Sequence, residues 1–226
     1  MFNLAAALRS PSSPISLNYI GVGYDTTNTS SYTFSSQSLG SVFSGRQIVI
    51  HLSWKGNSNS PAISSVTLAG DACTIIIQNT RGAAGEDNPG AAIAVIDYDS
   101  SYGTTEDIVV TTDAQCLNMA IGVTTMKHAN LTAYDTDSDA SNSSAMSLSL
   151  NTVDEGAILG TFTCKPVGDL AITNITELGE YDRGEGVTNG FYGNEISTGS
   201  TPLSLSANST DGANDDAVVV ASFQPK

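Results

Sequence analysis

The chain has 226 residues, a length that suits one large all-β domain, and it carries 8 Lys and Arg against 23 Asp and Glu, a formal net charge of −15 at pH 7. Nucleic-acid affinity comes mostly from basic groups that displace counterions from phosphates, so this acidic chain is not expected to bind nucleic acid. A folded chain of this length buries about 70% of the surface that it exposes when unfolded, so neither disulfides nor a metal is needed for stability.

The N-terminal residues 1–14 are expected to form a short extended arm. Phe2, Leu4 and Leu8 supply apolar contacts, and the prolines that follow disfavour a helix. The apolar run is too short for a secretory signal, no basic residue precedes it, and no run approaches the length of a membrane span. We therefore expect a protein kept in the cytosol until it assembles, with an arm that needs a surface to lie on.

Strand-like patterns dominate residues 15–223. Apolar and polar residues alternate with a period of two, which is typical of half-buried strands. The alternating runs are residues 47–54, 116–125, 146–150 and 203–206. Runs with less alternation and many β-branched residues are typical of central strands. These are residues 73–77, 91–96, 108–112 and 217–223.

Turn-forming clusters separate the strands. They lie at residues 55–61, 81–90, 97–103, 135–144, 181–193 and 208–215. Gly, Pro, Asn, Asp and Ser supply the dihedral angles and local hydrogen bonds that turns require. Neither an amphipathic helix nor an internal repeat is evident. The sequence therefore predicts an all-β protein, with a single antiparallel, jelly-roll-like β-sandwich domain over residues 15–226.

Asp135, Asp137 and Asp139 alternate within one of the predicted loops. An EF-hand would require Gly at the sixth position and Glu at the twelfth, where this chain has Ala140 and Met146. The motif is therefore not an EF-hand, although the carboxylates are a calcium candidate if the loop curls. The alternative is a solvated acidic loop tip.

The remaining polar candidates favour structural roles. A second acidic cluster, Asp211, Asp215 and Asp216, precedes the last predicted strand, where acidic residues commonly form turns. His51 lies on the polar face of its strand and His128 in a turn, so both are expected at the surface. No G-x-S-x-G elbow is present. We therefore expect neither an enzyme nor a cofactor.

Three cysteines, Cys73, Cys116 and Cys164, each lie in an apolar β-type run. Their odd number, wide spacing and lack of neighbouring histidines argue against disulfides or a zinc site. We predict buried thiols that pack as small apolar side chains.

A Gly-rich segment, residues 181–194, carries Tyr181, Phe191 and Tyr192. As a surface loop, it would present planar aromatic rings that stack on sugars or pack against a protein partner. The alternative is that these aromatic side chains cover one end of the sandwich.

Three segments carry a resemblance to a known class: the opening strand and polar turn at 15–34, the strand at 48–54 and the closing strand at 216–225. In style, residues 15–225 resemble the β-sandwich virion proteins of tailed bacteriophages, which include head decoration, head-spike, fibre and minor tail proteins.

The resemblance implies a non-catalytic, jelly-roll-like subunit, assembled in the host cytoplasm and exposed on the virion exterior. Capsid or tail subunits would be its partners through Phe2, Leu4 and Leu8, self-association as a trimer is common in the class, and contact with a host-surface glycan would fit. The other prediction is a carbohydrate-binding β-sandwich module, in which Tyr181, Phe191 and Tyr192 stack on glycans with help from calcium.

Overall fold

The computed structural model describes residues 13–82, 87–98, 103–142, 145–165, 169–182, 187–196, 198–199, 202–209 and 215–226. Within these ranges the regular secondary structure is antiparallel β-sheet, which confirms the predicted all-β, sandwich-like class. No helix in this part of the chain is long and apolar enough to cross a membrane. Most of the predicted arm, including Phe2, Leu4 and Leu8, lies outside the described residues.

The strands fall into two consecutive halves, residues 16–127 and 135–223. The first half holds β1 (Ser16–Asp25), β2 (Thr29–Ser38), β3 (Arg46–Gly56), β4 (Ile63–Leu68), β5 (Asp71–Ala72), β6 (Thr74–Thr80), β7 (Pro89–Asp97) and β8 (Thr105–Lys127). The second half holds β9 (Asp135–Ser141), β10 (Ala145–Leu150), β11 (Ala157–Lys165), β12 (Leu170–Ile172), β13 (Glu177–Asp182), β14 (Thr188–Glu195), β15 (Leu203–Ser209) and β16 (Asp215–Phe223).

The 23-residue strand β8 organises the first half. Its N-terminal part pairs with β2 and β4, and the part after Cys116 pairs with β1 and β3. Strands β7 and β6 continue the sheet beyond β3. The result is one eight-stranded sheet folded back on itself around a core that includes Tyr32, Trp54 and Ile121.

The second half is built from two separate sheets. The five-stranded sheet has the order β13-β14-β11-β16-β9, and the three-stranded sheet has the order β10-β15-β12. Their facing sides enclose a second core, which includes Met146, Phe162 and Val220.

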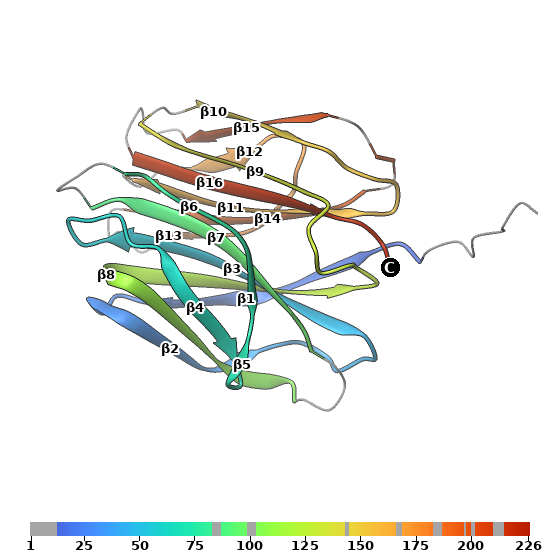
Figure 1. Cartoon of the computed structure of the whole chain (residues 1–226), viewed down its shortest axis with the longest axis horizontal. Coiled ribbons are helices and arrows are strands. Elements are labelled where there is room, and N and C mark those ends of the chain that lie inside the picture. Colours follow the sequence, from blue (N-terminus) through green and yellow to red (C-terminus); the bar gives the residue numbers. More distant parts are fainter. Residues whose placement is uncertain are drawn as a thin grey trace, which may run out of the picture.

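The two halves stack face to face. Figure 1 shows the layers in order, from β2 and β4, through β3 and β7, then β11 and β16, to β10 and β15. A third core, here called the central interface, fills the space between the halves and includes Val49, Ile93, Leu159 and Val219. Four β-layers therefore enclose three cores.

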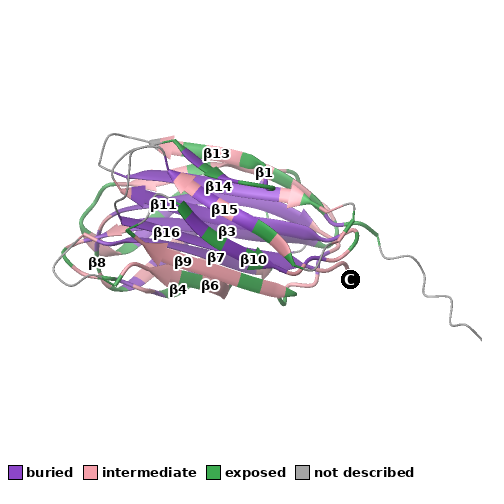
Figure 2. Ribbon diagram, turned by 90° about the horizontal axis from the view of Figure 1, so that it is seen from above, coloured by how far each residue is buried: buried purple, intermediate pink, exposed green. Residues whose placement is uncertain are grey.

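The layering explains which strands lack alternation. Strands β7 and β16 are covered on both faces, so the runs at 91–96 and 217–223 are almost entirely buried, as predicted for central strands (Figure 2). The run at 73–77 is different. It belongs mostly to β6, the last strand of its sheet, which is half-buried, so the predicted central position is wrong there.

Strand pairing divides the chain near residues 128–134. Among the described residues, no strand before this segment pairs with a strand after it, and the segment itself pairs only through an isolated bridge between Ala129 and Pro225. The central interface nevertheless joins the halves through buried side chains. That residues 15–226 behave as a single domain therefore stays a prediction.

Candidate functional site

Polar side chains cross the layer between the halves, and we call this group the polar seam. Its members are all buried: His51, Ser53, Thr124, Thr161, Thr163 and Asn189. The polar seam forms because side chains of β3 point alternately to its two faces. Leu52 enters the first core, while His51 and Ser53 face the second half. The expected surface position of His51 is therefore wrong, because β11 covers this face.

The His51 ring is held by three oxygen atoms. Nδ1 lies 3.1 Å from the Gly160 carbonyl and 3.1 Å from Thr161 Oγ1, and Nε2 lies 3.3 Å from Thr124 Oγ1. A carbonyl only accepts, so Nδ1 carries the hydrogen and Nε2 accepts from Thr124. Burial lowers the pKa of His51 to about 4, against the opposite effect of the hydrogen bond to Gly160. His51 is thus a neutral tie between the halves at neutral pH.

The next inward residue of β3, Ser53, makes a second tie. Its hydroxyl contacts Thr163 Oγ1 and donates to Asn189 Oδ1. The Thr163 hydroxyl donates to the Gly90 carbonyl across the same layer at 2.8 Å. These side chains are at most 1% exposed, so a substrate in solvent cannot reach the hydroxyls or the imidazole. The chemistry that the polar seam performs is hydrogen bonding between strands.

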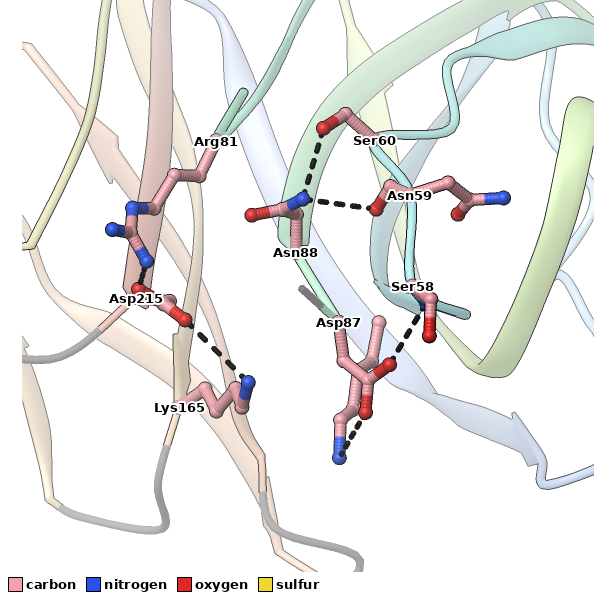
Figure 3. Close-up of polar contacts among 9 residues, drawn as sticks. Ser58, Asn59, Ser60, Arg81, Asp87, Asn88, Lys165 and Asp215 are labelled. Atoms are coloured by element: carbon pink, nitrogen blue, oxygen red, sulfur yellow. Dashed lines mark hydrogen bonds and ion pairs between the residues drawn. The ribbon is translucent and has the colours of Figure 1, made fainter. Parts of the chain in front are cut away.

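An ion cluster lies where the halves meet beyond the seam (Figure 3). Arg81, from the first half, contacts Asp215 Oδ1, and Lys165 Nζ lies 3.5 Å from Asp215 Oδ2. Asp215 opens β16 instead of belonging to a turn, which corrects the prediction. Two cations already neutralise this carboxylate, so it has little capacity to bind a metal ion. Asp211 lies outside the described residues.

A neighbouring network fixes two turns of the first half at the same end. Asp87 accepts the backbone N–H of Ser58 at 2.9 Å, and the Asn88 amide donates to the Asn59 carbonyl at 3.1 Å and to Ser60 Oγ at 2.9 Å (Figure 3). The side chains in the close-up therefore bind one another and the backbone, and they act as structural ties.

Asp216 is buried beside the core of the second half. Ser209 Oγ donates to its Oδ2 at 3.1 Å. Burial raises the pKa of Asp216 to about 6, and hydrogen bonds from Cys164, Ser209 and Lys165 and the charge of Arg81 act in the opposite direction. The carboxyl group therefore titrates in mildly acidic solution.

The predicted acidic loop is strand β9, so the loop assignment of Asp135, Asp137 and Asp139 is wrong. Asp137 Oδ2 accepts the backbone N–H of Ser149 at 2.7 Å, and Asp135 Oδ2 accepts that of Asn151 at 2.8 Å. We call these two bonds the carboxylate ladder, because the carboxylates take the place of strand carbonyls and join β9 to the next sheet. In the part of the chain that the structure describes, no three His, Cys, Asp or Glu side chains gather to hold a metal ion.

The prediction of an aromatic surface loop at residues 181–194 is also wrong. Phe191 and Tyr192 lie in β14, between β13 and β11, and are at most 1% exposed. Phe191 packs 5.7 Å from the His51 ring, while Tyr192 enters the second core. Tyr181 is half-buried in β13 and its ring lies 4.8 Å from that of Tyr24 in β1. Phe191 and Tyr192 cannot stack on a sugar in solvent.

The cysteines agree in part with the prediction. Cys116 and Cys164 are buried, whereas Cys73 is half-buried, and none of the three forms a disulfide. Burial raises the pKa of Cys73 and of Cys116 to about 12, so both stay protonated and poorly nucleophilic. His128 lies in a bend after β8, as predicted.

Neither models of known protein families nor curated proteins give a match to this sequence. Its function is therefore inferred from the fold and from the contacts described above.

Proposed function

We propose that this protein is a non-catalytic structural component of a tailed-bacteriophage virion, exposed on the capsid or tail as a decoration, spike, fibre or minor tail protein. The observation that supports this most strongly is where the reactive side chains lie. His51, Ser53, Cys164 and Asp216 are each at most 1% exposed, and their contacts join strands. Groups placed in this way stabilise a scaffold.

The outward surface supports the same proposal. Serines make up most of the outer face of β10 and β15, where the exposed or half-buried positions are Ala145, Ser147, Ser149, Ser204, Ser206 and Asn208. Hydroxyl-bearing strands together with a net charge of −15 disfavour non-specific association. Such a surface suits a protein that is displayed in many copies on a particle.

The start of the described chain supports an attachment role for the arm. The Ile15 N–H donates to the Glu155 carbonyl at 2.9 Å, and the Leu17 N–H donates to Glu195 Oε1 at 2.8 Å. These bonds tie residues 15 and 17, which follow the proposed arm in the sequence, to the second half. Anchored there, Phe2, Leu4 and Leu8 would dock on a capsid or tail subunit, and the copies could form a trimer, as the resemblance implies.

The carbohydrate-binding alternative has less support. It relied on Phe191 and Tyr192 as exposed stacking residues, and both are buried in β14. Binding of a host-surface glycan elsewhere on the chain is left to experiment.

The test is incorporation into particles. Phage particles purified from infected cells should contain the full chain, detected by mass spectrometry and immunogold microscopy. A variant lacking residues 1–13 should fold but be lost from the particles, while Tyr134→Ser, a change at an exposed side chain of the fold, should be incorporated normally. Absence of the full chain from particles would refute the proposed function, and normal incorporation of the truncated chain would refute only the role of the arm.

A further inference from the structure

The two halves have the same strand order. In the first half the larger layer reads β1-β8-β3-β7-β6, and in the second half it reads β9-β16-β11-β14-β13. The smaller layers are β2-β8-β4 and β10-β15-β12. With β5 left out, strands that have the same rank along the chain within their half also have the same place in the sheet. For example, β1, β3 and β7 match β9, β11 and β14. Two differences remain: β5 is extra, and β8 is continuous where β15 and β16 are separate.

Residues of β3 and β11 correspond at a separation of 110 positions, the separation between His51 and Thr161. Corresponding side chains have matching surroundings. Leu52 lies in the first core and Phe162 in the second, while Val49 and Leu159 both lie in the central interface. The match therefore extends from topology to the direction in which individual side chains point.

Corresponding residues also touch each other. His51 Nδ1 contacts Thr161 Oγ1, and Ser53 Oγ contacts Thr163 Oγ1, and each pair is 110 positions apart. In the interface of a two-fold symmetric dimer, residues near the axis contact their own copies. Two successive inward positions of β3 and β11 do so, which places a pseudo-two-fold axis along these strands.

The flanking strands follow the same relation. Strand β7 packs on β16, and its counterpart β14 packs on β8 through Phe191 and Gly122. Strand β6 lies beside β9, and its counterpart β13 lies beside β1, where Tyr181 meets Tyr24. Each strand in the layer therefore faces the strand that a two-fold rotation requires.

From these observations we infer that the chain is a tandem pair of one β-sandwich unit, and that the central interface and polar seam are a dimer-type interface enclosed within a single chain. The partner that this surface fits is a second copy of the unit. A single unit would expose the apolar side chains of its inner face, such as Val49 and Ile93, which are fully buried here, so fusion of two copies satisfies both faces at once.

The strand pairs on the two sides of β3 and β11, which are β7 with β16 and β8 with β14, form two flanks. Their facing residues differ in a complementary way. Beside His51 the neighbouring strands carry Ile93 and Gly122, and beside Thr161 the corresponding residues are Phe191 and Val219. Two branched side chains, Ile93 and Val219, belong to one flank. On the other flank a large ring faces a glycine, where an added Cβ would lie 2.7 Å from Phe191.

This divergence gives a direct test in the full chain. Gly122→Val alone should lower the urea midpoint because its side chain meets the Phe191 ring, and Phe191→Ile alone should lower it because a cavity remains. The double variant recreates the Ile93 and Val219 pair of the other flank, so its midpoint should exceed that of Gly122→Val. A double variant no more stable than the worse single variant would overturn the inference. If Gly122→Val does not fold, Gly122→Ala with Phe191→Leu supplies the same comparison.

A second experiment tests the interface itself. A protease site inserted between Thr132 and Ala133 of the full chain is cut after folding, with the uncut protein as control. The two fragments should elute as one particle of unchanged size and should reassociate after denaturation and dilution. Separation of the fragments in native buffer would show that the halves lack a dimer-type interface and would overturn the inference.

Discussion

Replacement of Asp216 by Asn should stabilise the protein at neutral pH. Asp216 is fully buried, and its pKa is about 6 in the folded protein against an ordinary value of 3.8. The folded state therefore holds the proton more tightly than the unfolded state. Folding bears the cost of ionising this group in full above pH 6, and the cost disappears as the pH falls below 3.8. Asn removes the charge and can still accept the hydrogen bond from Ser209.

The size of the effect follows from the two pKa values. The difference between about 6 and 3.8 corresponds to about 3 kcal/mol at pH 7.5, because each pKa unit is worth about 1.4 kcal/mol. This figure is an upper bound, since the amide N–H₂ group of the Asn must also be accommodated. We expect Asp216→Asn to raise the free energy of unfolding by about 1–3 kcal/mol at pH 7.5 and by almost nothing at pH 4.

Urea denaturation at a series of pH values between 4 and 7.5 measures this difference directly. Subtracting the wild-type curve removes the contribution of the other titrating groups. Asp97→Asn is a control for the same chemical change at an exposed position, because the Asp97 side chain is 65% exposed. The reasoning fails if Asp216→Asn is destabilising at pH 7.5, or if its effect does not change with pH.

Three further predictions concern the carboxylate ladder, the second core and the single-domain assignment. Asp137→Ala removes one bond of the carboxylate ladder and should cost about 1 kcal/mol of unfolding free energy, measured by urea denaturation. Thr136→Ala, at the exposed residue of β9 next to it, should cost less than half of that. Tyr192→Ala should lower the free energy of unfolding by about 3–5 kcal/mol because it leaves a cavity in the second core. On a glycan array, the wild type and the variant should give the same signals when their folded concentrations are equal. Residues 15–226 should unfold in one transition. The unfolding midpoint from the fluorescence of Trp54, in the first half, should then equal the midpoint from far-ultraviolet circular dichroism, and separate midpoints would contradict the single-domain prediction.

Strand β3 shows how far sequence reasoning reaches. Its alternation correctly separated Leu52 from His51 and Ser53, and so located one core face. Period-two patterns do not reveal what covers the polar face, and here the cover is β11, about a hundred residues later in the chain. The partners Thr161 and Thr163 alternate with apolar residues in the same way, and that alternation is the signal by which the seam could have been found.

The prediction for the acidic strand β9 was wrong for a different reason. Asp and Asn are depleted in strands and Ser is common in turns, so composition favoured a loop over residues 135–144. Asp135 and Asp137 are acceptable in this strand because their carboxylates accept backbone N–H groups of the adjoining sheet. Strand β14 is similar, since its Gly and Asn residues predicted a turn while both neighbouring strands supply its backbone hydrogen bonds. Such long-range pairing is not encoded in local composition.

Two buried titratable groups on the inner strands, His51 of β3 and Asp216 of β16, have opposite effects on stability as the pH changes, and this gives a last prediction. The pKa of His51 is about 4 against an ordinary 6.5, so its contribution to stability is complete above pH 6.5 and is lost as the pH falls towards 4, by about 3 kcal/mol. Over the same range the cost of ionising Asp216 disappears, also by about 3 kcal/mol. The two changes offset each other to within about 1 kcal/mol between pH 4 and 7.

Single variants should therefore reveal pH dependences that the wild type conceals. Asp216→Asn keeps only the loss at His51 and should become less stable, relative to its own value at pH 7, as the pH falls. His51→Gln, whose amide can bond to Gly160 and Thr124, keeps only the gain at Asp216 and should show the opposite slope. Measured by urea denaturation, the double variant should return to the pH dependence of the wild type. Slopes of the same sign in the two single variants would show that burial does not control both protonation equilibria.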